Sequence, residues 1–278
     1  MKKIYKKVLG ITGAKGSLGR YFIKNNKDKY IFRIYKKRIE NKKNISSWLN
    51  KNKDIEIFLH LAGISTIIKS KINPKKTYLI NSKSTIQLIK IINNIKLVKL
   101  KYFLFASTSH VYKPSFRKIS EKSKRNPVTI YGKSKKKAED FILKNSNNFS
   151  FKIGIARIFN FYSSHHKEGF FIYDLIKKIK KNKKNLFIKK INTLRDYISI
   201  NELCDILNFM IKNKIIKPLN AGSGKSINLI ELVKKIKKKY KLKTRIEFQD
   251  KKFPGLYSDN KMIKKFGYNK PFKKFNFK

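Results

Sequence analysis

The 278-residue chain has one cysteine, few acidic residues and no long apolar run. A lone thiol, Cys204, excludes an intrachain disulfide framework, which suits a reducing compartment. No apolar stretch approaches the ~18 residues that a membrane-spanning helix needs. A strand predicted to begin at residue 4 leaves no room for a signal peptide. We therefore expect a cytoplasmic protein with no membrane partner.

Acidic residues are scarce: 16 Asp and Glu stand against 70 Lys and Arg, for a net charge of +54. Such a charge attracts nucleic acid and other polyanions. The lysines are nevertheless scattered along the chain, with local crowding at 177–184 and 234–241, rather than gathered in one tail. Codons of an A/T-rich genome explain the abundance of Lys, Asn, Ile, Phe and Tyr but not the scarcity of acids. Nucleic-acid binding is expected to be at most non-specific.

Strand-like apolar runs alternate with longer helical segments up to about residue 160. This βαβ rhythm predicts a parallel sheet. Beyond it, shorter strands and helices predict a smaller lobe that closes over a substrate. The expected organisation is an α/β fold with a first domain at 1–160 and a C-terminal substrate-binding lobe at 161–278.

The first predicted strand, 4–12, runs into the glycine-rich turn GAKGSLG and then into an amphipathic helix. In this turn Gly13 permits the tight bend, Gly16 lets a pyrophosphate approach the backbone, and Gly19 lets the helix pack on the strand. The helix N-terminus, with Ser17 and Leu18, supplies free N–H groups to a phosphate. The pattern predicts a Rossmann-type doubly wound sheet that binds a dinucleotide, although its GxxGxxG spacing differs from the commonest fingerprint.

The end of the second predicted strand bears on which dinucleotide is bound. A carboxylate there would bind the ribose 2′-hydroxyl of NAD, whereas a cation accepts the 2′-phosphate of NADP. The segment 30–38 ends in Lys36, Lys37 and Arg38 with no carboxylate. This favours NADP slightly over NAD, although lysine fills most exposed positions of the chain.

Tyr131 and Lys135 are four residues apart in a predicted helix, so their side chains share one face. An ammonium beside a phenol lowers its pKa from ~10 toward the range useful for acid–base catalysis. Thr108, in the run FASTSHVY, could bind the reacting oxygen as a second hydroxyl. These three residues are the predicted catalytic set.

Several segments in this order resemble the NAD-dependent epimerase/dehydratase family of extended short-chain dehydrogenases/reductases, which modify nucleotide sugars. Besides the glycine-rich turn, the resemblance rests on HLAG at 60–63, FASTSHVY at 105–112, NPVTIYGKSKKKAED at 126–140, RIFNFY at 157–162, and two C-terminal segments, RDYISINEL and LNAGSGKSINLIEL. Ser70, Pro74, Tyr78, Asn81 and Thr85 also stand at the family's offsets.

The resemblance implies roles for further residues. It places Leu61, Ala62, Gly63 and Asn81 at the cofactor, Lys135 at the nicotinamide ribose, and Asn160 and Arg195 at the diphosphate of the substrate. It also implies a homodimer, and a return of parts of 195–212 to pack on the first domain.

The chain departs from the family at two places. The 4,6-dehydratases carry Asp–Glu after the active-site Thr, whereas this chain has Ser109 and His110, which argues against water elimination. Near the C-terminus, Phe253 and Leu256 flank Pro-Gly where the family often has Arg and Asp. The substrate clamp is therefore altered.

These observations predict an NAD(P)-dependent nucleotide-sugar epimerase or 4-ketoreductase, with Tyr131 as the acid and base. The alternative is a non-catalytic Rossmann-fold protein that binds nucleic acid or another polyanion. Adjacent His165 and His166 lack spaced Cys or carboxylate partners, so no metal site is predicted.

Overall fold

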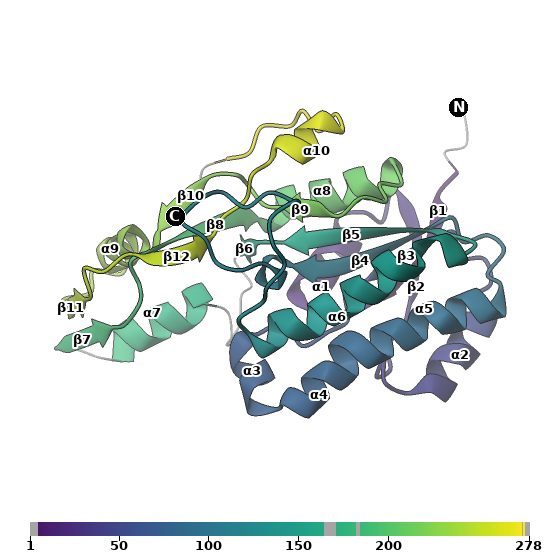
Figure 1. Ribbon diagram of the computed structural model, residues 1–278, viewed down its shortest axis with the longest axis horizontal. Helices are drawn as coiled ribbons and strands as arrows, with labels where there is room; N and C mark the ends of the chain where they lie inside the picture. Colours follow the sequence, from purple (N-terminus) through teal and green to yellow (C-terminus); the bar gives the residue numbers. More distant parts are fainter. Residues whose placement is uncertain (1–4, 164–170, 182–183, 274, 276–278) are drawn as a thin grey trace.

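The structure is a computed structural model that describes residues 5–163, 171–181, 184–273 and 275. A parallel sheet with helices on both faces forms the larger part, and a smaller lobe with α7, α9, β7 and β11 lies at one end (Figure 1). The predicted α/β fold, a Rossmann-type parallel sheet with a smaller C-terminal lobe, is confirmed, and the structure shows that the C-terminal region contains mixed sheet.

The main sheet has six parallel strands in the order β2-β1-β3-β4-β5-β9. Crossover helices join the first five, and this covers both faces of the sheet. The strands are β1 (Lys7–Thr12), β2 (Tyr30–Ile34), β3 (Ile57–His60), β4 (Tyr102–Thr108), β5 (Lys152–Ile158) and β9 (Leu219–Ala221).

The helices vary in length from one turn to more than four turns. They are α1 (Ser17–Lys24), α2 (Lys42–Asn50), α3 (Ile67–Ile72), α4 (Pro74–Tyr78), α5 (Ser84–Ile95), α6 (Ile130–Asn145), α7 (Phe171–Lys181), α8 (Ile200–Lys212), α9 (Leu229–Lys239) and α10 (Lys261–Lys265). A π-helical turn, Leu79–Lys83, joins α4 to α5, and short 3₁₀ turns cover Ser109–Val111 and Ser146–Asn148.

Strand β4 shows why the sheet has a core on each face. Its side chains alternate between faces, and both sets are buried. Tyr102 and Leu104 pack with α1 and α8, whereas Phe103 and Phe105 pack with α2, α5 and α6. Figure 1 shows α8 on one side of the sheet and α2, α5 and α6 on the other.

Strand β9 and helix α8, which precedes it, belong to the C-terminal half of the chain but pack with the main sheet. Helix α8 begins at a capping box, in which Ser199 and Glu202 satisfy each other's backbone N–H groups. Its apolar face, which includes Leu203, Leu207 and Met210, belongs to the same core as β1 and β4. Residues far apart in the sequence therefore build one layer.

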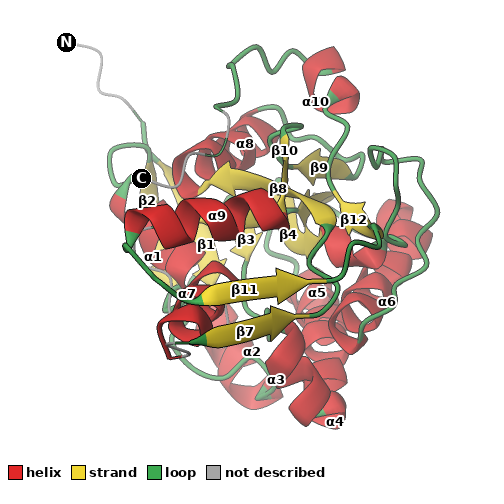
Figure 2. Cartoon of the chain, turned by 90° about the vertical axis from the view of Figure 1, so that its left-hand side faces the viewer, coloured by secondary structure: helices red, strands yellow, loops and turns green. Residues whose placement is uncertain are grey.

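The smaller lobe is organised around β8 (Thr193–Ser199), which pairs with β6 (Asn160–Tyr162), β10 (Ser226–Asn228) and β12 (Phe253–Leu256). Strands β7 (Asn185–Ile188) and β11 (Arg245–Phe248) form a separate parallel pair. Figure 2 shows this pair side by side, with α9 next to β11. The apolar faces of α7 and α9 pack together with Tyr197 and Phe275 in the core of this lobe.

The carboxyl ends of β1, β3, β4 and β5 meet at one edge of the sheet, which faces the smaller lobe (Figure 1). In parallel α/β sheets, this edge is where ligands bind. Among the described residues, no helix is both long and apolar enough to cross a membrane.

Candidate active site

A cavity of about 580 Å³ lies at this edge, between the sheet and α7. It is bordered by segments that come from both parts of the chain. Twelve of the residues singled out from the sequence line it: Gly13, Gly16, Ser17, Leu18, Gly19, Leu61, Ala62, Gly63, Thr108, Tyr131, Lys135 and Asn160. The folded chain thus brings the glycine-rich turn, the loop after β3 and the Thr–Tyr–Lys set to one hollow.

The three glycines of the turn differ in what surrounds them. Gly13 has a φ of +76°, and a Cβ there would lie 2.6 Å from the backbone N of Ala62. A Cβ at Gly19 would lie 2.4 Å from the Gly13 carbonyl oxygen. At Gly16 the nearest atom would be 3.3 Å away. Gly13 and Gly19 are therefore required by the protein's own packing, whereas Gly16 leaves space on the cavity side.

The start of α1 fits the pyrophosphate of a dinucleotide. Gly16 is the N-cap residue and provides no side-chain cap, and the first turn carries no acidic residue. The N–H groups of the first turn have no partner within the helix, and the positive end of the helix dipole points the same way. Because Ser17, Leu18 and Gly19 line the cavity, these donors lie beside it.

Tyr131 sits in the first turn of α6, next to the end of β4 that carries Thr108. Helix α6 begins where the Thr129 side chain accepts a hydrogen bond from Gly132 N, and this orients Tyr131 toward the cavity. Both side chains are buried. Burial raises the pKa of the Tyr131 phenol, and the nearby Thr108 hydroxyl acts in the opposite direction.

Lys135 is buried one turn further along α6. Its Nζ donates to the Ala106 carbonyl oxygen at 2.9 Å and lies 4.6 Å from the centre of the Phe105 ring. Burial lowers the pKa of this amine to about 7, while the Glu139 carboxylate acts to raise it.

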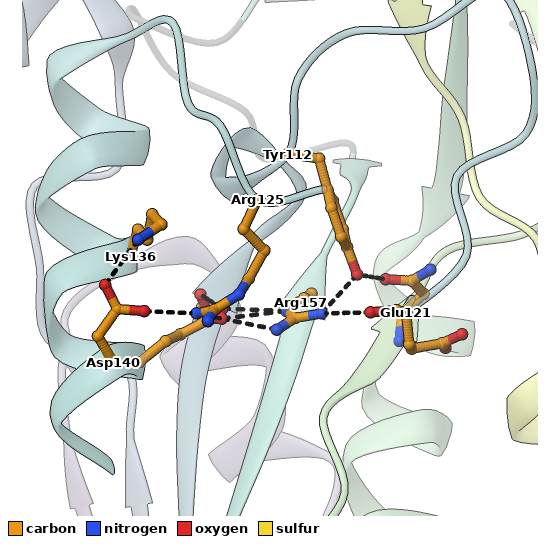
Figure 3. A network of polar contacts seen from close by, with 9 residues as sticks. Tyr112, Glu121, Arg125, Lys136, Asp140 and Arg157 are labelled. Atoms are coloured by element: carbon orange, nitrogen blue, oxygen red, sulfur yellow. Dashed lines mark hydrogen bonds and ion pairs between the residues drawn. The ribbon is translucent and has the colours of Figure 1, made fainter. Parts of the chain in front are cut away.

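A polar network runs behind the Thr–Tyr–Lys set, away from the cavity. The Glu139 carboxylate is fully buried and pairs with Arg157 at 2.8 Å. It also accepts from the Ser107 hydroxyl at 2.5 Å, one residue before Thr108. In Figure 3 the network extends from Lys136 and Asp140 on α6, through Arg125 and Arg157, to Tyr112 and Glu121. These contacts join α6, β4 and β5 behind Thr108, Tyr131 and Lys135.

Two buried polar residues hold the loops around the cavity. The His60 ring nitrogens are paired with the hydroxyls of Thr12 at 2.6 Å and Thr85 at 3.0 Å. Burial lowers the pKa of His60 to about 3. Asn81 does not line the cavity; its side-chain amide pairs with the backbone N and O of Ile64 and donates to Ser134. Asn81 therefore acts on the loop after β3.

Lys36, Lys37 and Arg195 also lie outside the main cavity wall. Lys37 borders a separate open hollow of about 610 Å³ together with Arg38, Glu40, Asn41 and Asn44. Lys36 is exposed and borders neither hollow. Arg195 is partly buried and donates to Thr193 Oγ1 and the Leu194 carbonyl, and its charge acts on His110.

Further residues line the cavity without having been predicted from the sequence; they come from the loop after β3, from α3 and α7, and from β4 to β8. Phe171, Asp174, Leu175 and Lys178 lie on one side of α7, and their i, i+3, i+4 and i+7 spacing was visible in the sequence. His110 follows Thr108 by two residues and was noted only as a departure from the family. His165 and His166 lie outside the described residues, and within those residues no group of His, Cys, Asp and Glu could hold a metal ion.

The chain is similar to known proteins over most of its length. A family model described as GDP-mannose 4,6 dehydratase matches residues 6–271. The GDP-6-deoxy-D-talose 4-dehydrogenase of Aggregatibacter actinomycetemcomitans is 27% identical over 212 residues, which cover 74% of this chain and 70% of that protein.

Solved structures of low sequence identity share the fold. The dTDP-4-dehydrorhamnose reductase of Bacillus anthracis, in complex with NADP, has a TM-score of 0.81 at 18% identity and covers 98% of this chain and 95% of its own. MoeE5, in complex with UDP-glucuronic acid and NAD, has a TM-score of 0.79 at 19% identity and covers 93% of this chain and 91% of its own. The chain belongs to the NAD-dependent epimerase/dehydratase family of extended short-chain dehydrogenases/reductases, the nucleotide-sugar modifying enzymes.

Proposed function

We propose that the protein is an NAD(P)-dependent nucleotide-sugar epimerase or 4-ketoreductase that acts at C4 of a hexose ring. One observation carries the proposal: a single cavity is lined by the phosphate-type turn, by Thr108, Tyr131 and Lys135, and by residues of the smaller lobe. The 4-dehydrogenase activity in the name of the relative supports a reaction at this carbon.

Different parts of the chain are proposed to bind the cofactor and the substrate. We assign the cofactor to residues 1–160, with its pyrophosphate at Gly16 and the start of α1, and the substrate to residues 161–278. When bound, the nicotinamide would accept a hydride from the sugar carbon or return it. Lys135 lies against Gly63 and the end of β4, where its amine can bind a ribose hydroxyl.

Tyr131 is the proposed acid and base. It takes the proton of the sugar hydroxyl when that carbon is oxidised and returns a proton to the keto oxygen when it is reduced. Thr108 holds the same oxygen by a hydrogen bond. A raised phenol pKa keeps Tyr131 protonated at neutral pH, which suits proton donation to a ketone. Formation of the phenolate requires a nearby positive charge, which a protonated Lys135 can supply.

On the substrate side, we propose that Asn160 and Arg195 contact the diphosphate. Asn160 lines the cavity, whereas Arg195 must turn from Thr193 and Leu194 to reach it. Strand β12, which carries Phe253 and Leu256, pairs with β8 beside Arg195, so no second cation from this segment joins it. Ser109 and His110 stand where the 4,6-dehydratases carry an acidic pair, and we therefore do not assign water elimination.

We propose NADP as the preferred cofactor, because the hollow after β2 is bordered by two cations, Lys37 and Arg38, against one carboxylate, Glu40. The similar structures hold NADP in one case and NAD in the other, so the preference rests on charge. We also propose a homodimer, which sedimentation equilibrium would test.

The test is fluorescence titration of the protein with NADPH and NADH, with salt raised to about 0.2 M to suppress non-specific attraction by the +54 charge. We expect saturable binding that survives this salt. Gly16→Val should abolish the binding, because its side chain would occupy the space beside the start of α1, and circular dichroism checks that the variant is folded. A Cβ at Gly16 has one neighbour within 4 Å, the Gly13 carbonyl oxygen at 3.3 Å. Gly16→Ala is the matched control, because its smaller side chain should cause a smaller loss of cofactor affinity.

Turnover is then sought with nucleotide sugars and NAD(P). Binding that disappears with salt, together with a failure to turn over any sugar, would overturn the proposal. That result would favour the non-catalytic, polyanion-binding alternative.

A further inference from the structure

His110 differs from His60 in one respect that matters for function. The rings of His60 and His110 both lie near the edge of the sheet. Each ring nitrogen of His60 is hydrogen-bonded to a threonine hydroxyl. The His110 ring has no hydrogen-bond partner within the part of the chain that the structure describes, and it is not sealed from solvent. Because His110 lines the cavity, the hydrogen-bonding capacity of its ring is available to a group bound there.

The position of His110 is rigidly determined. Its backbone N donates to Thr108 Oγ1 at 3.2 Å, which ties it to the proposed catalytic threonine. On the other side, a Cβ at Gly132 would lie 2.1 Å from the His110 carbonyl oxygen, so α6 packs directly on its backbone. The His110 ring is 5.8 Å from the Tyr131 ring, with an angle of 58° between them. Its distance from the reacting oxygen is therefore set by the same contacts that hold Tyr131.

The surroundings of His110 decide which chemical group it can bind. Burial, together with the positive charge of Arg195 on β8, lowers the pKa of His110 to about 4. A neutral imidazole offers one N–H donor and one acceptor nitrogen. This pair matches a hydroxyl group, which both donates and accepts, whereas a phosphate is better matched by the nearby guanidinium of Arg195.

We propose that His110 binds the sugar hydroxyl on the carbon next to the reacting carbon, and so selects substrates that carry a free hydroxyl there. The proposal rests on the proposed function, because it takes the sugar to lie against Thr108 and Tyr131. His110 is then a third side chain on the sugar ring, and the selected class is a nucleotide sugar with a vicinal diol or an α-hydroxy ketone. A deoxy sugar at that position leaves the imidazole unpaired and is bound more weakly.

The test uses the NADP⁺-loaded protein and isothermal titration calorimetry. The probes are UDP-glucose, UDP-galactose, GDP-mannose and dTDP-glucose, each compared with its own nucleoside diphosphate. The ratio of the two affinities measures what the sugar adds. His110→Phe keeps a ring against Tyr131 but removes both nitrogens, whereas His110→Gln keeps a donor and an acceptor.

For the probe that the wild type prefers, we expect His110→Phe to reduce the contribution of the sugar by about ten- to a hundred-fold. His110→Gln should restore a large part of it, and NADPH affinity and melting temperature should be unchanged in both variants. In wild type, the corresponding deoxy sugar should bind as weakly as the normal sugar binds to His110→Phe. An unchanged sugar contribution in His110→Phe, with the wild type binding a probe normally, would overturn the inference.

A spectroscopic readout separates this role from a purely structural one. Long-range ¹⁵N NMR of the imidazoles should show the His110 ring, identified by its loss in His110→Phe, as neutral at pH 6. Its nitrogen shifts should move on addition of the preferred nucleotide sugar and stay unchanged with the nucleoside diphosphate alone. Equal shifts with both ligands would contradict contact with the sugar. If the wild type binds none of the probes and turns none over, it is the proposed function that fails.

Discussion

The Nζ of Lys135 donates a hydrogen bond to the carbonyl oxygen of Ala106 at 2.9 Å, two residues before Thr108 on the same strand. This bond joins the helix that carries Tyr131 to the strand that carries Thr108. It also holds an amine in a buried position between Phe105 and Glu139, where its charge is costly. The lysine is therefore poised to change its protonation state near neutral pH.

The first prediction concerns the pH dependence of stability. The pKa of Lys135 is about 7 in the folded protein and 10.5 for the free side chain. Between these values the unfolded chain binds more protons than the folded one, so the stability contributed by this group rises with pH. Urea unfolding of wild type and Lys135→Met should therefore be compared from pH 7 to 9. The free energy of unfolding of the wild type should rise relative to that of the variant, by at most about 1.4 kcal/mol per pH unit.

Exposed Lys133, on the same helix, provides the control for loss of one positive charge. The free energy of unfolding of Lys133→Met should change with pH in the same way as that of the wild type over this range. If the free energies of unfolding of wild type and Lys135→Met differ by the same amount at every pH from 7 to 9, the buried amine does not titrate in this range.

The second prediction concerns the proposed acid and base. Tyr131→Phe removes only the phenolic hydroxyl, so NADPH affinity should stay within a factor of about two, and the fold should be unchanged. Turnover should fall by roughly a hundred- to ten-thousand-fold, the usual contribution of a positioned acid or base. Steady-state kinetics alongside the NADPH titration make the comparison, and near-normal kcat in the variant would sink the assignment of Tyr131.

The third prediction concerns the network behind the site. Glu139 is fully buried against Arg157, whereas its neighbour Asp140 has 42% of its side chain exposed. Removing the charge of Glu139 leaves Arg157 buried without a counter-ion, so Glu139→Gln should cost about 3–5 kcal/mol of the free energy of unfolding.

Asp140→Asn is the matched control, one residue along the same helix and in contact with Arg125 and Lys136. Its exposed ion pairs are expected to contribute less than about 1 kcal/mol. Denaturant unfolding of both variants decides the matter, and equal losses would mean that burial of the carboxylate is not what stabilises this region.

The fourth prediction concerns the choice between NADP and NAD. Lys37 borders the hollow after β2, and the adjacent Lys36 does not. Lys37→Gln should weaken NADPH binding about tenfold, because a partly exposed cation on a phosphate contributes on the order of 1 kcal/mol, and should leave NADH binding unchanged. Lys36→Gln has the same change in net charge and should weaken NADPH binding far less. Equal effects of the two variants would point to the overall charge rather than to a phosphate site.

Much of the fold could be predicted from the sequence because its signals are local. The alternation of apolar strands and helices up to residue 160 predicted the parallel sheet that the structure contains. The glycine spacing predicted the tight turn before α1, where a side chain at Gly13 or Gly19 would collide with the backbone. The pairing of β9 with β5 depends on contacts between segments about sixty residues apart, and no local pattern specifies those.

The sequence by itself determined the residues that face one another across one turn of helix or at the end of one strand, since backbone geometry dictates their spacing. Only the tertiary structure decided which long side chains reach the cavity. It brings Lys37 rather than Lys36 to the hollow after β2 and directs Lys135 to Ala106. It also places the His110 ring beside Tyr131, with no hydrogen-bond partner for that ring among the residues that the structure describes. The direction and burial of such side chains depend on which distant segments pack around them, and that is settled only when the whole chain is folded.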